Sequence, residues 1–301
     1  MDYSIFCKYF TPEELLSNTP MSEHTSFKVG GAADLMIMPS RATKIKKAID
    51  LCKSEGLPYF IMGKGSNLLV RDSGFRGVVI CMSKYLEKIE LADDCTIKAE
   101  AGTTLSKLAS FAMERSLSGL EFASGIPGSL GGALYMNAGA YECEMKDIVL
   151  TAGVMNNSGE EFLMHISEMQ LGYRSSVFQK SNYIIIDSTL RLSKGDKEQI
   201  KEKMLELNSR RKEKQPLDLP SGGSTFKRPE GYYASKLIDD AGLKGFTIGG
   251  AKVSEKHAGF IVNYNNATAK DIISLMEHVK SVVYEKFGVM LTPEVEIIGD
   301  S

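Results

Sequence analysis

The chain has 301 residues, of which 43% are hydrophobic and 25% charged, and its net charge at pH 7 is −2. It is long enough for two or three domains and too apolar to be disordered. The near-balanced charge gives no reason to expect nucleic acid as a partner, and no apolar run reaches the length of a membrane span.

The cysteines and histidines do not have the spacing of a disulfide framework or a metal site. The five cysteines are scattered and odd in number, and the four histidines are equally dispersed. The N-terminus lacks a basic segment followed by an apolar core, so we expect no secretory signal. Together these features favour a metal-free protein of the reducing cytoplasm.

The first third of the chain has the pattern of a β-α-β unit followed by short strands. The expected elements are a short helix from Pro12, a strand at 33–38, a helix from an N-cap at Ser40 to a stop at Gly56, and strands at 59–62, 68–70 and 78–82. The glycine-rich segment 63–67 lies directly after one of these strands. Strand ends of this kind are where α/β sheets bind ligands.

The remaining residues indicate two further units separated by a linker at 215–220. The expected elements are a strand at 97–101, a helix capped by Thr103, strands at 147–155 and 183–192, a charged helix at 196–214, a helix at 232–240, a strand at 260–262, a helix from Thr268 to Gly288 and a strand at 295–298. We therefore predict domains at residues 1–84, 85–214 and 215–301.

The stretch from Gly125 to Ala140 contains five glycines and a proline among its sixteen residues. Glycine allows sharp turns and close approach of the backbone to a ligand, and neighbouring N–H groups can then hold a phosphate. A tight structural corner would use the same residues. The second glycine loop at 63–67 favours a large phosphate-bearing cofactor that is held by backbone from two sides, with 125–140 as a buried loop.

Three familiar motifs are incomplete. Leu68 stands where a dinucleotide-binding fingerprint needs its third glycine, and Lys64 is followed by Gly65 instead of the Ser or Thr of a P-loop. Ser224 and Lys227 have the Ser-x-x-Lys spacing of acyl-serine enzymes. The other motifs of that class, Ser-Asp-Asn and Lys-Thr-Gly, are missing, so this match carries little weight.

An ordered set of motifs along nearly the whole chain resembles the UDP-N-acetylenolpyruvoylglucosamine reductase family, also called UDP-N-acetylmuramate dehydrogenases. The set comprises GKGSNLLV at 63–70, GIPGSLGG at 125–132, NAGAY at 137–141, YRSS at 173–176, GSTFK at 223–227, AKVSEKHAGFIVN at 251–263 and PEV at 293–295. The resemblance implies an α+β protein: a two-subdomain FAD-binding fold of the vanillyl-alcohol oxidase type followed by a C-terminal α+β substrate domain.

The resemblance also implies an activity in peptidoglycan precursor synthesis. FAD and NADPH would be the cofactors, and the enolpyruvyl ether of UDP-N-acetylglucosamine enolpyruvate would be reduced to the lactyl ether of UDP-N-acetylmuramate. Other readings are a different FAD-dependent oxidoreductase of the same fold, a non-catalytic flavin or UDP-sugar binding protein, and an acyl-serine enzyme. The motifs beyond residue 215 argue against the first, and retention of the three catalytic positions argues against the second. A colourless purified protein would favour the third.

Three side chains match the family's catalytic positions. Ser224 would donate the proton, with Lys227 or Lys214 supporting its loss of a proton. Arg174 would meet the negative charge that develops on the substrate carboxylate, because its planar fork binds a carboxylate in two places. Glu294 would hydrogen-bond that carboxylate if protonated, or position Arg174 if ionised. The sequence leaves both options open.

The remaining predicted site residues fall into two groups. Substrate-binding cations are Lys214 and Arg228, each proposed to contact the diphosphate. The cofactor-binding residues are Gly63, Lys64, Gly65, Ser66, Asn67, Leu68, Gly125, Ile126, Pro127, Gly128, Ser129, Gly131, Gly132, Asn137, Ala138 and Gly139. The segment between Arg174 and Lys214 is too short for the tyrosine-bearing loop of some family members, which places the chain in the loopless branch. His257 is expected to be structural.

Overall fold

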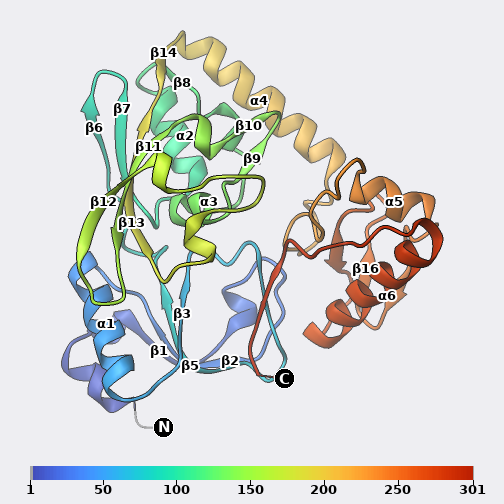
Figure 1. The fold of residues 1–301 in the computed structure, drawn as a ribbon, viewed down its shortest axis with the longest axis horizontal. Helices are drawn as coiled ribbons and strands as arrows, with labels where there is room; N and C mark the ends of the chain where they lie inside the picture. Colours follow the sequence, from blue (N-terminus) through green and yellow to red (C-terminus); the bar gives the residue numbers. More distant parts are fainter. Residues whose placement is uncertain (1–2, 301) are drawn as a thin grey trace. The chain divides into compact units, whose positions relative to one another are not determined.

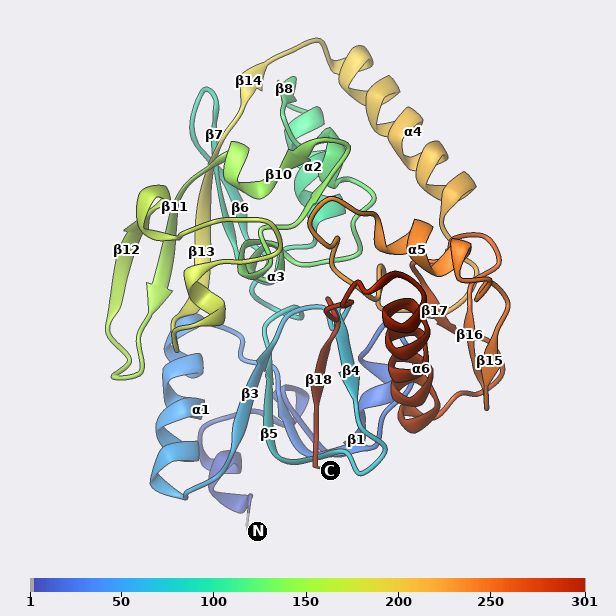
Figure 2. The ribbon, with the colours of Figure 1, turned by 45° about the vertical axis from the view of Figure 1, so that its right-hand side comes forward.

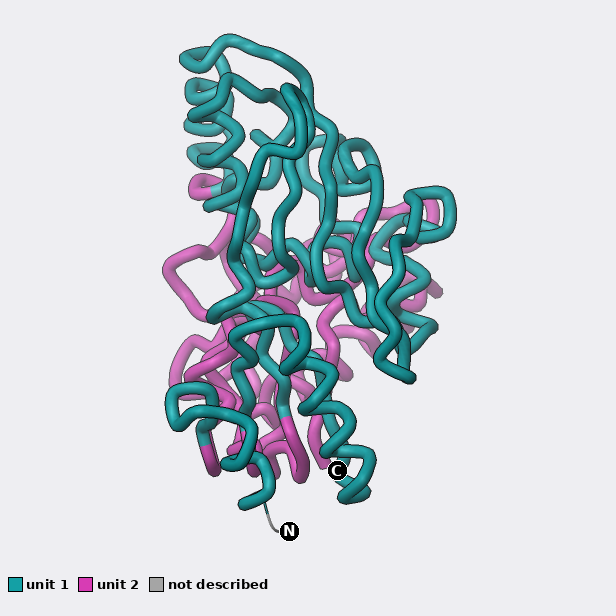
Figure 3. Tube along the Cα trace, turned by 90° about the vertical axis from the view of Figure 1, so that its left-hand side faces the viewer, with its two compact units in different colours: residues 1–16, 36–64, 79–211 teal, residues 17–35, 65–78, 212–301 magenta. Residues whose placement is uncertain are grey.

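A computed structural model describes residues 3–300 of the protein and is drawn in Figure 1 and Figure 2. The chain forms two compact units, coloured separately in Figure 3. Unit 1 comprises residues 1–16, 36–64 and 79–211, and unit 2 comprises residues 17–35, 65–78 and 212–301. Each unit therefore combines segments that are far apart in the sequence. The division at 84/85 and 214/215 stays a prediction.

Unit 1 is built on a five-stranded sheet in the order β12-β11-β13-β7-β6, in which every neighbouring pair is antiparallel. Its strands are β6 (Ile89–Asp93), β7 (Thr96–Glu100), β11 (Val149–Met155), β12 (Glu161–His165) and β13 (Ile184–Arg191). Helices α2 (Leu105–Met113) and α3 (Leu130–Tyr135) bury their apolar residues in the same core as β7, β11 and β13.

Unit 1 also contains several shorter elements and two further helices. They are α1 (Ala42–Ser54), α4 (Lys197–Lys214, which ends in unit 2), β3 (Tyr59–Met62), β8 (Leu117–Ser118), β9 (Gly139–Ala140), β10 (Cys143–Glu144) and β14 (Ser193–Lys194). Short 3-10 turns occupy η1 (Ser4–Lys8), η2 (Pro12–Glu14), η3 (Met21–Glu23, in unit 2), η4 (Glu121–Ala123), η5 (Met145–Asp147), η6 (Ile166–Glu168) and η7 (Val177–Gln179). A four-stranded sheet has the order β1-β2-β5-β3, with β1 at Leu15–Pro20, β2 at Ala32–Ile37 and β5 at Phe75–Cys81.

Unit 2 packs two helices on a small sheet. Strands β15 (Thr247–Ile248), β16 (Ala251–Val253) and β17 (Ile261–Asn263) form an antiparallel sheet, and α5 (Ala234–Asp240) and α6 (Ala269–Phe287) share its apolar core. The last strand, β18 (Glu296–Ile298), pairs in parallel with β4 (Leu68–Val70), as Figure 2 shows. Phe27 and Leu69 join the same core, so residues from the first quarter of the chain complete the C-terminal fold.

Several predicted elements are confirmed. Strands β3 and β4 have the predicted bounds. Helix α6 is capped by Thr268, whose side chain accepts a hydrogen bond from the N–H of Asp271, and it ends at Gly288 with a left-handed φ of 67°. A local cap, a continuous apolar face and a glycine stop were all readable in the sequence, which is why these bounds could be predicted.

Other predictions are wrong at helix starts. Ser40 does not cap α1, because its N–H donates to Oε1 of Glu14 at 2.9 Å and Arg41 occupies the N-cap position. Thr103 does not cap α2, because that helix begins one residue later and Thr104 accepts from the N–H of Lys107 at 3.3 Å. The segment from Pro12 forms only a 3-10 turn before β1.

The glycine stretch is not a continuous loop. Residues 130–135 form α3, whose side chains of Leu130, Ala133 and Leu134 are buried in the core of unit 1. Burial of this apolar face outweighs the low helix propensity of the two glycines, and tertiary packing of this kind is what stabilises most short helices. Over residues 3–300, every helix falls short of the length or apolarity that a membrane crossing requires.

Candidate functional site

Gly63 of the first predicted cofactor loop contacts Ser129 of the second within unit 1. A Cβ built on Gly63 would lie 2.4 Å from Oγ of Ser129, so no larger residue fits at position 63 without displacing Ser129. Gly131 is held against the end of β7: its N–H donates to the carbonyl of Ala101 at 2.8 Å, and a Cβ there would lie 2.9 Å from Cβ of Ala101. These glycines are needed for close packing between backbone segments.

Two buried hydroxyls near these glycines lack protein partners. Ser129 is 1% exposed and Thr103 is fully buried, and neither Ser129 Oγ nor Thr103 Oγ1 has a hydrogen-bond partner among the described residues. The two segments are joined by backbone, since the N–H of Leu130 donates to the carbonyl of Thr103 at 2.8 Å. A buried hydroxyl without a partner costs free energy, so a bound polar ligand would stabilise this arrangement.

Asn137 is fully buried, and its side chain is committed to the protein. Its Nδ2 donates to Oε2 of Glu144 and to the carbonyl of Gly172, each at 2.9 Å, and its Oδ1 accepts from the N–H of Lys146 at 2.9 Å. Its φ is 42°. The contacts that the structure gives to this predicted cofactor residue thus fasten the turn that precedes Arg174.

Arg174 sits in a tight turn with a left-handed backbone. Gly172 and Ser175 exchange backbone hydrogen bonds around it at 3.0 and 3.2 Å, and its φ is 50°. Its Nη2 donates to the carbonyl of Gly139 at 3.2 Å, and its guanidinium lies 5.2 Å from the ring centroid of Tyr173. A non-glycine residue in this conformation is strained and is found preferentially at functional sites.

In unit 2, Ser224 and Glu294 come from neighbouring segments. Ser224 is exposed between Gly223, whose φ is 83°, and the fully buried Thr225. The carbonyl of Thr225 accepts the N–H of Glu294 at 2.9 Å, and Phe226 and Pro293 form an antiparallel bridge. The backbone carrying the predicted proton donor therefore lies directly beside the backbone carrying the predicted acid.

Thr225 was not predicted as a site residue. Its N–H donates to the carbonyl of Gly259 at 2.8 Å, and its Oγ1 accepts from the N–H of Ile261 at 2.9 Å. All these contacts hold the residue that follows Ser224. The only signal in the sequence is a threonine next to the serine of the GSTFK motif, and that signal does not separate a positioning role from an ordinary buried threonine.

The segment from Gly65 to Leu68 also lies in unit 2. A Cβ on Gly65, whose φ is 67°, would lie 2.2 Å from the carbonyl oxygen of His24. Asn67 donates through Nδ2 to the carbonyl of Glu294 at 2.9 Å, and its own carbonyl accepts the N–H of Glu296 at 3.0 Å. Burial raises the pKa of Glu296, the first residue of β18.

The predicted cations occupy different settings. Lys214 is the exposed last residue of α4, and the exposed Arg228 places its guanidinium 4.4 Å from the ring centroid of Tyr233. The N–H of Lys227 donates to the carbonyl of Thr292 at 2.9 Å. His257 packs 5.0 Å from the ring of Phe260 and its Nδ1 accepts the N–H of Gly259, in agreement with the structural role predicted for it.

The structure thus brings together two groups of predicted residues. Gly63 contacts Ser129 in unit 1, and Asn67, Glu294 and the Ser224 segment are joined by hydrogen bonds in unit 2. Arg174 belongs to unit 1, whereas Ser224 and Glu294 belong to unit 2. Their assembly into one catalytic constellation stays a prediction.

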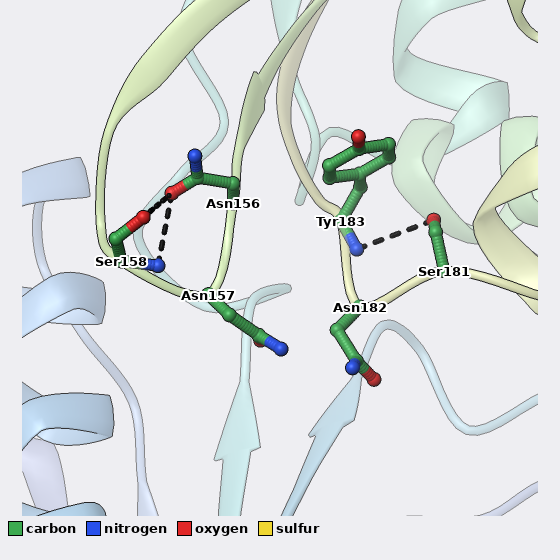
Figure 4. A pocket seen from close by; sticks show the side chains of 6 residues that line it. All are labelled: Asn156, Asn157, Ser158, Ser181, Asn182 and Tyr183. Carbon is green, nitrogen blue, oxygen red and sulfur yellow. Dashed lines mark hydrogen bonds between the residues drawn. The ribbon is translucent and has the colours of Figure 1, made fainter.

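A pocket elsewhere in unit 1 contains none of these residues. It is lined by Asn156, Asn157, Ser158, Ser181, Asn182 and Tyr183, shown in Figure 4. Oδ1 of Asn156 accepts from the N–H and the hydroxyl of Ser158, both at 2.9 Å, and the N–H of Tyr183 donates to Ser181 at 3.3 Å. These contacts stabilise two turns and give no indication of a ligand.

Comparison with known proteins identifies both parts of the chain. Residues 33–163 match the family model described as an FAD binding domain, and residues 215–298 match the model described as the C-terminal domain of UDP-N-acetylenolpyruvoylglucosamine reductase. A reductase of this name from Alkaliphilus oremlandii is 51% identical over 99% of this chain and 98% of that protein. One from Clostridium botulinum strain Eklund 17B is 48% identical over 98% and 97%.

A solved structure extends the similarity to three dimensions. The crystal structure of UDP-N-acetylenolpyruvylglucosamine reductase from Thermus caldophilus matches with a TM-score of 0.80 and 34% identity, over 93% of this chain and 97% of that one. With the FAD-binding and C-terminal domain matches, this confirms the predicted fold class, a two-subdomain FAD-binding fold followed by a C-terminal α+β domain.

Proposed function

Since the chain belongs to the UDP-N-acetylenolpyruvoylglucosamine reductase family, we propose that it reduces the enolpyruvyl ether of UDP-N-acetylglucosamine enolpyruvate to UDP-N-acetylmuramate. The protein is an FAD-containing reductase that uses NADPH and acts in peptidoglycan precursor synthesis. We place it in the cytoplasm, a location supported by its five free cysteines.

The residues around Gly63 and Ser129 fit an FAD site. The contact between Gly63 and Ser129 leaves no space for a side chain at position 63. The buried hydroxyls of Ser129 and Thr103 have no hydrogen-bond partner among the described residues. A ligand with many acceptor oxygens, such as a dinucleotide, would satisfy both hydroxyls. When bound, FAD supplies the hydride-transfer chemistry that no amino-acid side chain offers.

We assign the remaining chemistry to three side chains. Ser224 donates the proton that completes the reduction; it is an exposed residue, and the next residue, Thr225, is fixed by hydrogen bonds. Arg174 binds the substrate carboxylate as negative charge gathers on it. Glu294 either hydrogen-bonds that carboxylate or orients Arg174. The observation that supports this assignment is the hydrogen bond from the N–H of Glu294 to the carbonyl of Thr225, which joins the backbone of the proposed acid to the residue after the proposed proton donor.

Half-reactions test the assignment of Ser224. We expect the Ser224→Ala variant to retain FAD and to be reduced by NADPH at the wild-type rate under anaerobic conditions. Its reoxidation by the enolpyruvyl substrate should be blocked, because the proton donor is missing. Steady-state turnover near that of the wild type would refute the proton-donor role, and a colourless purified protein would refute the flavoenzyme assignment.

Arg228 is proposed as a diphosphate-binding cation. Its guanidinium lies 4.4 Å from the ring centroid of Tyr233, so the ring restricts its movement. We expect Arg228→Ala to weaken the apparent affinity for the UDP-sugar while kcat changes little. An unchanged apparent affinity for the UDP-sugar would contradict this proposal. We expect Lys214→Ala to weaken the apparent affinity for the UDP-sugar in the same way.

The described residues between Arg174 and Lys214 form η7, β13, β14 and α4 with short connections.

A further inference from the structure

Asn67 makes two hydrogen bonds to the segment that carries Glu294. Its side-chain Nδ2 donates to the carbonyl of Glu294 at 2.9 Å, and its backbone carbonyl accepts the N–H of Glu296 at 3.0 Å. The parallel pairing of β4 with β18 begins one residue later, where Leu68 is paired with Glu296. The side chain of Asn67 therefore extends the β4–β18 ladder by one bond toward Glu294.

The backbone before Asn67 does not continue the strand. Gly65 has a left-handed φ of 67°, and its carbonyl accepts the N–H of Ser26 at 3.1 Å. The chain thus turns away from β18 just where another donor is needed for the carbonyl of Glu294. Buried or half-buried carbonyl groups need such donors, and the Asn67 amide supplies one.

The other backbone group of Glu294 is fixed from the opposite side. Its N–H donates to the carbonyl of Thr225 at 2.9 Å, and Thr225 is fully buried with all of its own polar groups engaged. Hydrogen bonds therefore link Asn67 to Glu294 and Glu294 to Thr225, and Thr225 directly follows Ser224 in the chain. All four residues lie in unit 2.

We propose that Asn67 is a positioning residue for the reaction, whose side-chain amide fixes Glu294, and through Glu294 the Ser224 segment, relative to residues 65–67. The inference rests on the proposed function, since it requires that Glu294 and Ser224 act on the substrate. It differs from the prediction of Asn67 as a cofactor-binding residue, because the partner of its Nδ2 is the backbone of Glu294.

The proposal separates the two half-reactions. Flavin reduction by NADPH needs neither Glu294 nor Ser224, whereas reduction of the enolpyruvyl ether needs both. Small displacements of catalytic groups lower rates strongly, by as much as about 10²-fold for 1 Å. Loss of the Asn67 amide should therefore slow the second half-reaction selectively.

Two variants of Asn67 test this prediction. Asn67→Ala removes the amide, and Asn67→Asp keeps its shape but replaces the donor with an oxygen. We expect both variants to fold and to retain FAD, and to be reduced by NADPH within about threefold of the wild-type rate. Reoxidation by UDP-N-acetylglucosamine enolpyruvate should slow by at least about tenfold, on the scale expected for a misplaced catalytic group.

Ser73→Ala is the matched control. The hydroxyl of Ser73 donates a hydrogen bond to the backbone carbonyl of Asp300 at 2.6 Å, and the two residues are also 227 positions apart in the sequence. This bond lies outside the proposed site. Both half-reactions should keep their wild-type rates in this variant. A general effect of losing a hydrogen bond between these segments would slow Ser73→Ala as well, and that result would overturn the proposal.

A double-variant cycle distinguishes positioning from direct catalysis. If Asn67 acts by positioning Glu294, the loss of reoxidation rate in the Asn67→Ala/Glu294→Gln protein should be smaller than the product of the two single losses. If the two single losses of reoxidation rate multiply in the double variant, the proposal is overturned. Loss of FAD from Asn67→Ala with equal slowing of both half-reactions would also overturn it. Normal reoxidation of Asn67→Ala beside a slow Glu294→Gln would refute the inference alone. Normal reoxidation of Glu294→Gln would instead refute the catalytic role of Glu294 in the proposed function.

Discussion

Nη2 of Arg174 donates a hydrogen bond to the carbonyl oxygen of Gly139 at 3.2 Å. This contact ties the guanidinium to the end of the glycine-rich stretch, and it fixes the direction in which the planar fork points. The strained backbone of Arg174, with a φ of 50°, is held in place by the hydrogen bonds between Gly172 and Ser175. The arrangement restricts a flexible side chain before any substrate binds, which is how binding sites lower the cost of ordering.

We expect Arg174→Lys to lower kcat/KM for the enolpyruvyl substrate by about 10²-fold, the loss typical of removing one donor that stabilises developing charge. Lysine keeps the charge, but a single ammonium cannot both reach the Gly139 carbonyl and bind a carboxylate in two places. Anaerobic reduction by NADPH should stay unchanged. Arg210→Lys is the control, because Arg210 forms an exposed ion pair with Glu206 on α4. Equal losses in the two variants would contradict the assignment.

Asn137 should be important for stability, because its side chain makes three hydrogen bonds in a fully buried position. We expect Asn137→Ala to lower the free energy of unfolding by about 2–4 kcal/mol. Asn137→Gly tolerates the φ of 42° and so isolates the loss of the hydrogen bonds from backbone strain. The exposed Asn157→Ala should change stability by less than about 0.5 kcal/mol. Urea unfolding at fixed FAD concentration measures all three.

Local signals account for the elements that could be predicted. Helix α6 carries its own capping box, apolar face and glycine stop, and β3 and β4 are short apolar runs on either side of a glycine loop. Helix α3 was missed because Gly131 and Gly132 argue against a helix, while the burial that stabilises it depends on a sheet formed by distant residues. The start of α1 depends on Glu14, a residue that lies 26 positions before Ser40.

The site was predictable in its residue types and not in its connections. The motifs containing Ser224 and Glu294 are contiguous and were readable by resemblance. The hydrogen bond from Asn67 to Glu294 joins residues 227 positions apart in the sequence, and no local sequence pattern predicts a contact between residues so far apart. The contact between Gly63 and Ser129 could not be predicted either. The two loops were predicted to lie on opposite sides of a cofactor, but the sequence did not indicate that these two residues touch.

Acid should destabilise the contact between η2 and α1. Burial alone raises the pKa of Glu14, but hydrogen bonds from Lys44, Ser40 and Thr11 outweigh it and lower the pKa to about 2. A depressed carboxyl pKa contributes stability above the unfolded value of 4.5 that is lost as pH falls toward 2. We expect up to about 3 kcal/mol of unfolding free energy to disappear over this range.

Glu14→Gln provides the comparison, because it does not titrate. The stability difference between wild type and Glu14→Gln should be largest near pH 7 and should shrink as pH falls from 4.5 toward 2, when measured by denaturant unfolding at fixed FAD concentration. A difference that is constant with pH would show that packing of the side chain, and not its charge, stabilises this contact.

Gly63→Ala should weaken FAD binding, because the added methyl group would clash with the side chain of Ser129. The added Cβ would lie 2.4 Å from Oγ of Ser129, and the backbone of Gly63 is not left-handed, so crowding is the only penalty. Overpacking of this kind costs about 1–3 kcal/mol, which corresponds to roughly 5- to 150-fold in affinity if the FAD-bound protein bears it. Titration of the deflavinated protein with FAD, followed by flavin fluorescence, measures the change.

Ser129→Ala removes the crowded oxygen and leaves Cβ of Ser129 at 3.7 Å, an ordinary van der Waals distance. The double variant Gly63→Ala/Ser129→Ala should therefore bind FAD more tightly than Gly63→Ala and about as tightly as Ser129→Ala. Ser129→Ala alone should weaken binding by up to about tenfold, because it deletes one hydroxyl available to the cofactor. If the double variant binds as weakly as Gly63→Ala, then the added methyl group meets the cofactor itself, and position 63 must be glycine because FAD passes directly over it.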